Sequence, residues 1–172
     1  MKSSNSFGKN KLEPAKILVD HCKFEYEDLS DTWRDIERKA QGGVAIVGIF
    51  LIGGLTYLRF FGPENPFALG VIFSSMAILV VSALFAVSAL LVDEVKTVQS
   101  SGEVREDFDA GSDEANLEEA LRQYLDRWGI VNEDLSAKND KKSARVLYSQ
   151  YGLLAGIIGI SMGVVIAFAC GS

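Results

Sequence analysis

The sequence predicts an all-α integral membrane protein with three transmembrane helices and a helical collar on the cytoplasmic side. Three long apolar stretches support this prediction, from Gly43 to Leu58, Phe67 to Val92 and Tyr151 to Cys170, and none contains a charged residue or a histidine. At a rise of about 1.5 Å per residue, each stretch can cross a bilayer as a helix. The chain has 172 residues, 48% of them hydrophobic, so three spans leave too few residues for a large soluble domain.

Charged residues are distributed unevenly around the apolar stretches. Of the 17 Lys and Arg residues, eight precede the first stretch, eight lie between the second and third, and only Arg59 lies between the first and second. Cytoplasmic flanks are enriched in Lys and Arg. We therefore expect a multi-pass protein of the cell inner membrane with a cytoplasmic N-terminus and an external C-terminus. We expect no cleaved signal peptide, because more than 40 mostly polar residues precede the first stretch.

The chain is predicted to contain five segments. Residues 1–13 form a disordered tail, 14–42 a cytoplasmic amphipathic helix, 43–92 a transmembrane hairpin, 93–149 a cytoplasmic helical segment and 150–172 a third transmembrane helix. Within the hairpin, the first span covers about 43–61 and the second about 67–92. The external turn Gly62–Pro66 joins them, because a glycine and two prolines oppose helix formation.

The N-terminal helix presents one apolar stripe. Pro14 suits a first helical turn, and apolar residues then recur at alternating spacings of four and three, namely Cys22, Tyr26, Leu29, Trp33, Ile36 and Ala40. The other faces are charged, so the stripe requires a covering partner. We predict that Tyr26, Leu29, Trp33 and Ile36 bind a second copy or a soluble protein. Gly42 and Gly43 predict a kink at the membrane, with a hinge as the alternative.

Small residues in the spans predict close helix packing. The second span places Ser75, Ser82, Ala86 and Ala89 on one face. The third span has small residues four apart, at Ala155, Gly159, Gly163 and Ala167, with Gly152 and Gly156 beside them. We expect this ridge to pack against a neighbouring copy, so that the protein is a homo-oligomer in membrane lipid. The alternative is an ordinary glycine-rich bundle.

The second loop is predicted to hold several short helices. Ser112 or Asp113 is the expected N-cap and Gly129 the expected end of a helix whose apolar face carries Leu117, Leu121, Tyr124, Leu125 and Trp128. Asn132 and Asp140 are expected to cap two further helices, the second of which enters the membrane. The helix from Ser112 to Trp128, packed against the N-terminal helix from Pro14 to Gln41, completes the predicted collar.

The sequence carries no clear signal of catalysis or of a cofactor. The single histidine, His21, lies beside Cys22 and near Glu25, but the remaining ligands of a zinc site are missing, as is a second histidine for a catalytic triad. No phosphate-binding loop follows a strand. The spans hold no ionisable residue for an ion relay. We therefore expect neither an enzyme nor a pump, and no metal or cofactor.

Two passive membrane roles remain. In the first, an oligomer forms a pore, and the hydroxyls of Thr56, Ser75 and Ser82 line a narrow path between apolar gates. These serines have an alternative role, which is to donate to carbonyls of their own helix. In the second, the protein is a non-conducting scaffold that anchors a soluble partner through its cytoplasmic amphipathic helix.

The order of the segments is itself informative. The charged segment YEDLSDTWRDIERKAQGG leads into the span GVAIVGIFLIGGLTYL, followed by a short turn, a second span and a helical segment. This layout resembles the SLATT-type small transmembrane effectors of bacterial antiphage systems. With its third span it is also similar to the membrane effector of Hailong systems, whose partner is a nucleotidyltransferase-like enzyme that makes a nucleic-acid messenger.

The resemblance implies an oligomeric inner-membrane pore. Such a pore is gated or held closed through its cytoplasmic helices by a partner or by a nucleotide or oligonucleotide messenger. The candidate ligand contacts are basic residues of the second loop: Arg122, Arg127, Lys138, Lys141, Lys142 and Arg145. A simpler interpretation of the last four is a positive flank of the third span.

Overall fold

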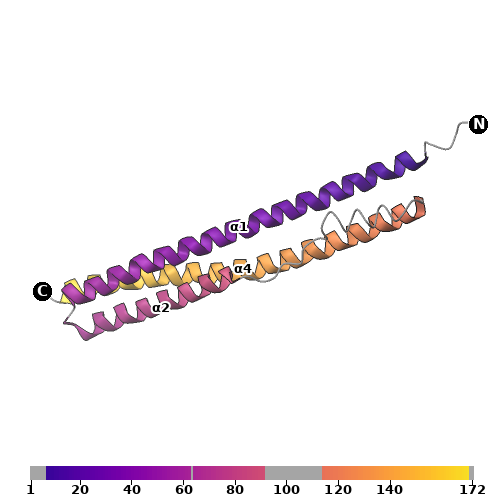
Figure 1. Cartoon of the computed structure of the whole chain (residues 1–172). Coiled ribbons are helices and arrows are strands. Elements are labelled where there is room, and N and C mark those ends of the chain that lie inside the picture. The colour runs from indigo at the N-terminus through magenta and orange to yellow at the C-terminus, as the bar shows by residue number, and fades with distance from the viewer. Residues whose placement is uncertain (1–6, 63, 92–113, 171–172) are drawn as a thin grey trace, which may run out of the picture. The chain divides into compact units, whose positions relative to one another are not determined.

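A computed structural model describes residues 7–62, 64–91 and 114–170, and within these the side chains of 17–62, 64–91, 119 and 121–169. The helices are α1 (Phe7–Phe61), α2 (Pro66–Leu90) and α4 (Glu114–Cys170), and the described residues contain no strand (Figure 1). Each helix includes a segment long and apolar enough to cross a membrane. The prediction of an all-α protein with three membrane-spanning helices is confirmed.

α1 is one uninterrupted helix of 55 residues. It begins at Phe7, within the predicted tail, and residues 1–6 of that tail lie outside the described residues. It continues through Gly42 and Gly43 and ends at Phe61. A glycine in a helix interior costs only about 1 kcal/mol relative to alanine, so two of them do not end a helix that is packed on one side. The charged and apolar halves of α1 are therefore one element.

α2 begins with a complete N-terminal cap. Asn65 has an extended backbone, and its Oδ1 accepts a 2.9 Å hydrogen bond from the amide of Phe67. Pro66 occupies the first turn, where a backbone N–H would have no acceptor within the helix, so its absence costs nothing. The chain thus reverses between Phe61 and Pro66, as predicted for the external turn, although Pro63 itself lies outside the described residues.

α4 is a single helix of 57 residues, which corrects the predicted division of the second loop. No helix ends at Gly129, and neither Asn132 nor Asp140 is an N-cap, because all three lie inside α4. Trp128 and Val131 on either side of Gly129 are buried, and their packing offsets the small cost of a helical glycine. The predicted caps at Ser112 and Asp113 lie outside the described residues.

The described residues form two units. The first, here called the N-terminal helix pair, contains α1 up to Trp33 and α4 up to Asn139. Its two helices are parallel, because Asn132 bonds to the carbonyl of Cys22 and Asn139, one heptad later, to that of Leu29. Two amphipathic helices thus cover each other, which is the contact predicted for the collar.

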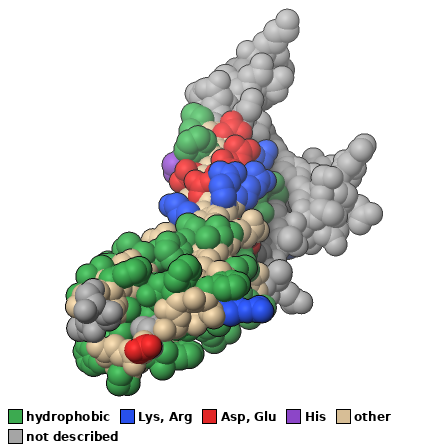
Figure 2. All heavy atoms as spheres, turned by 90° about the vertical axis from the view of Figure 1, so that its left-hand side faces the viewer, with side chains coloured by type: hydrophobic (Ala, Val, Ile, Leu, Met, Phe, Trp, Pro, Cys, Tyr) green, Lys and Arg blue, Asp and Glu red, His purple; other side chains and the backbone are tan. Residues whose placement is uncertain are grey.

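The second unit, here called the three-helix bundle, contains α1 from Arg34, α2, and α4 from Asp140. α2 runs antiparallel to α4 and supplies most of the centre, where Ala68, Ile72, Leu79, Ala86 and Ala89 are fully buried. Many outward-facing side chains of the bundle are hydrophobic as well, and Figure 2 shows them covering the viewed end. A helix that is apolar on all sides is typical of a lipid-surrounded bundle.

Candidate functional site

Four glycines bring the backbone of α4 against α2. The facing pairs are Gly152 with Ser82, Gly156 with Leu79, Gly159 with Ser75 and Gly163 with Ile72. A Cβ added to Gly156 would lie 2.5 Å from Leu79 Cγ, and one added to Gly163 would lie 2.6 Å from Ile72 Cγ1. No side chain fits in these spaces without moving its neighbour. Such close approach is how helices associate in lipid, where hydrophobic burial contributes little.

This contact changes the role predicted for the third-span ridge. The sequence predicts that Gly159 and Gly163 face a neighbouring copy, whereas both face α2 of the same chain. Ala155 is exposed and Ala167 is half-buried. The ridge is filled within the chain, because the side chains of Leu79 and Ile72 of α2 occupy the space beside Gly156 and Gly163. α2 therefore occupies the space that a second copy would need beside Gly159 and Gly163.

The three predicted pore-lining hydroxyls occupy different environments. Ser75 Oγ donates to the carbonyl of Val71 at 2.7 Å, which is the alternative role considered for it. Ser82 Oγ donates across to the carbonyl of Ser149 at 2.6 Å, and both predicted serines are buried. Thr56 is exposed. Of the three, only Thr56 lies on an outer surface of the chain.

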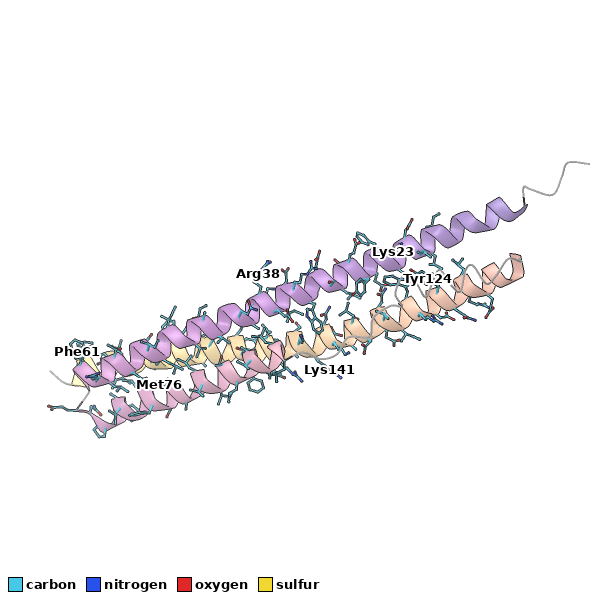
Figure 3. The ribbon with its side chains drawn as sticks, viewed as in Figure 1. Lys23, Arg38, Phe61, Met76, Tyr124 and Lys141 are labelled. Carbon is cyan, nitrogen blue, oxygen red and sulfur yellow. The ribbon has the colours of Figure 1, made fainter. Side chains whose placement is uncertain are left out.

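In the membrane, α1 has one packed face and one open face. On the packed face, a Cβ added to Gly54 would lie 3.4 Å from the sulfur of Met76, and Figure 3 shows Met76 on α2 beside α1. On the open face, Gly53 has no atom within 4 Å of its Cβ position, and Thr56 is exposed nearby. The exposed side chains of Ile49, Ile52 and Phe60 flank these two residues, so the open face is a small gap within an apolar surface.

Lys142 is a fully buried charged residue in the bundle. Its side chain is 0% exposed, and its Nζ lies 3.2 Å from Oε1 of Glu37, whose side chain is 33% exposed. A buried ammonium group is tolerated only when it is paired, so this contact ties α4 to α1. Lys142 can reach a ligand only by leaving its pocket, which counts against its predicted role in ligand binding.

The other predicted ligand contacts are partly engaged as well. Arg145 Nη1 donates to the carbonyl of Ser88 at 2.8 Å, near the C-terminus of α2, where a cation also complements the helix dipole. Lys138 pairs with Asp134 at 2.9 Å. The remaining three residues, Arg122, Arg127 and Lys141, are exposed, and Figure 3 shows Lys141 directed away from α1.

α4 covers the apolar stripe of α1 within the same chain. In the helix pair, Tyr26 packs edge-on against Trp128 with ring centroids 5.5 Å apart, and Leu29 and Trp33 are half-buried. In the bundle, Ile36 is 8% exposed and belongs to a cluster with Val146 of α4. A soluble protein could bind the predicted stripe only after displacing α4.

The polar residues of α4 that face α1 are not anticipated by the sequence analysis. Buried residues follow one another at alternating spacings of four and three, namely Trp128, Asn132, Leu135, Asn139, Lys142, Val146 and Ser149. The spacing is a heptad signal that the sequence contains. It is obscured because four of its members are polar, and because Asn132 also has the chemistry of an N-cap.

Cys22 is a half-buried thiol in the N-terminal helix pair. Burial, and secondly the negative charge of Glu25, raises the pKa of this thiol. It is therefore protonated at neutral pH and a poor nucleophile. Within the described part of the chain, no three His, Cys, Asp or Glu side chains gather closely enough to hold a metal ion.

Comparisons with protein-family models, curated proteins and solved structures give no match. The function is therefore inferred from the residues and contacts above.

Proposed function

We propose that this chain is the subunit of an oligomeric pore in the inner membrane of a bacterial cell, controlled through its extramembrane helices. The observation that carries the proposal is the continuity of α1 and α4. Each runs without interruption from a charged segment into an apolar span. A partner or ligand that moves the charged segment therefore acts on the span through a continuous helix, without an intervening loop.

The spans support a passive role in the membrane. Their interiors carry no ionisable residue, and this is unlike a pump or a secondary transporter, which needs charged groups at membrane depth. Because the glycine ridge of α4 is occupied by α2, the open face of α1 is the surface we assign to contacts between subunits. Thr56 lies on that face and is the candidate lining residue.

The trigger is proposed from the resemblance to SLATT-type and Hailong-type effectors. A nucleotide or oligonucleotide messenger, made by a nucleotidyltransferase-like partner, is the ligand that the resemblance suggests. Arg122 and Arg127 are exposed on the N-terminal helix pair and are the remaining candidate contacts there. The scaffold alternative has less support, because its docking stripe is already covered by α4.

Ion flux in liposomes tests the pore. Purified full-length protein in liposomes should release trapped potassium in proportion to the amount inserted, and its expression in cells should depolarise the membrane. Thr56→Val should lower single-channel conductance, because it removes a lining hydroxyl. Ser161→Ala is the matched control, since Ser161 is an exposed span residue whose Oγ bonds to its own helix at Ile157. Inserted protein that neither leaks ions nor depolarises cells contradicts the proposal.

A further inference from the structure

The contact between α1 and α4 in the N-terminal helix pair has a mixed character. Four residues of α4 at heptad spacing are at most 9% exposed: Trp128, Asn132, Leu135 and Asn139. Trp128 and the two asparagines contact α1 at Tyr26, Cys22 and Leu29. Two of the four are asparagines in positions where a parallel helix pair normally places apolar residues. The interface therefore buries side-chain amides, and each is satisfied only if both its nitrogen and its oxygen form hydrogen bonds.

Each asparagine satisfies only its amide nitrogen. Asn132 Nδ2 donates to the carbonyl of Cys22 at 3.2 Å and to Glu25 Oε2 at 3.0 Å. Asn139 Nδ2 donates to the carbonyl of Leu29 at 2.8 Å. The Oδ1 atoms of both residues and Nε1 of Trp128 are buried without a hydrogen-bond partner. No other buried side-chain nitrogen or oxygen in the described residues is unpartnered, so the deficit is confined to this one interface.

The glycine contact of the bundle differs in this respect. There, α2 packs directly against the glycines of α4, and the buried hydroxyls of Ser75 and Ser82 are both hydrogen-bonded. The helix pair thus loses hydrogen bonds that water would provide, while the bundle contact does not. An interface with unpaired buried polar atoms is easier to open, because opening restores those bonds.

We propose that the N-terminal helix pair opens reversibly. Residues 22–33 of α1 separate from residues 125–139 of α4, while the glycine contact of α2 with α4 stays closed. Separation hydrates Asn132, Asn139 and the indole N–H of Trp128 together. This inference does not depend on pore formation. In a pore, it would identify the element on which a trigger acts.

Removing the unpaired atoms should make the N-terminal helix pair open less often. Asn132→Leu with Asn139→Leu deletes both orphaned Oδ1 atoms and leaves no new ones, because the carbonyls of Cys22 and Leu29 keep their helical bonds and Glu25 is exposed to water. The matched control is Glu133→Leu with Asp140→Leu, at the adjacent exposed positions of the same helix. Both variants add two leucines, but only the first changes the interface.

Hydrogen exchange of the full chain in nanodiscs, followed by mass spectrometry, gives the readout. The asparagine variant should slow amide exchange in 22–33 and 125–139 by about tenfold or more, whereas the control should stay within about twofold of wild type. The single variant Asn139→Leu should give a smaller change in the same direction, which keeps the test decisive if the double variant misfolds. Unchanged or faster exchange in the asparagine variants, or equal slowing in the control, overturns the proposal.

Discussion

Gly156 shows how little space separates α2 from α4. A Cβ at this position would lie 2.5 Å from Leu79 Cγ and 3.2 Å from the backbone oxygen of Ser75. Gly156→Leu should therefore lower the free energy of unfolding by about 1–3 kcal/mol, because overpacking a tight helix contact forces the backbones apart. Equilibrium unfolding in mixed micelles measures this loss. Gly70→Leu in α2, where no atom lies within 4 Å of the Cβ position, should cause no loss, because the added side chain meets open space and leucine favours a helix more than glycine does. Equal losses at both positions would show that the close contact is not the cause.

The charge of Lys142 sets a second residue-scale prediction. Lys142→Glu places a carboxylate at a fully buried site beside Glu37 and should destabilise the protein by about 2–4 kcal/mol. Adding Glu37→Lys restores opposite charges and should recover more than half of that loss, although the partial exposure of position 37 weakens the attraction. Unfolding of the two single variants and the double variant forms the required cycle. A double variant no more stable than Lys142→Glu alone argues against a specific ion pair.

The thiol of Cys22 makes a prediction about pH. Because burial and Glu25 raise its pKa in the folded state, its contribution to stability is complete below the unfolded-state pKa and is lost as pH rises through the folded-state value. In a Cys170→Ser background, alkylation by iodoacetamide should have a midpoint above that of the unfolded chain. Glu25→Gln should lower the midpoint only partly, since burial is the larger cause. No shift between folded and unfolded protein would contradict the burial.

At the scale of the helix, Gly129 distinguishes a continuous α4 from two shorter helices. The structure places Gly129 inside α4, with no atom near its Cβ position and without positive φ. Gly129→Ala should therefore stabilise the protein by about 0.5–1 kcal/mol through helix propensity. Thermal unfolding measures this gain. If Gly129 instead ended a helix in the left-handed conformation, the same substitution would destabilise it.

At the scale of the whole molecule, the two cysteines report the topology. The positive-inside prediction places Cys22 in the cytoplasm and Cys170, at the end of α4, outside. A membrane-impermeant maleimide applied to spheroplasts should label Cys170 in a Cys22→Ser variant and should not label Cys22 in a Cys170→Ser variant. Both should react after denaturation, which controls for the low reactivity of Cys22. The opposite pattern would invert the topology.

Much of the architecture follows from local properties of the chain. Hydropathy locates the three spans, and the helix ends at Phe61 and Pro66 follow from a glycine and prolines that cannot continue a helix. The apolar stripe from Tyr26 to Ile36 predicts a covered face. In contrast, the prediction that a helix ends at Gly129 is wrong. The cost of one helical glycine is smaller than the free energy gained by packing its neighbours Trp128 and Val131.

The choice of partners depends on which helices meet in space. The pattern of Gly159 and Gly163 predicts a close helix contact, yet the same pattern fits a second copy or a helix of the same chain, and the fold selects α2. In the sequence, Lys142 belongs to a cluster of basic residues that flanks the third span, but in the structure α1 buries it against Glu37. Hydrophobicity and charge act residue by residue and fix the spans and their expected orientation. The burial of a polar group depends on residues distant in sequence, and the three-dimensional arrangement alone assigns its role.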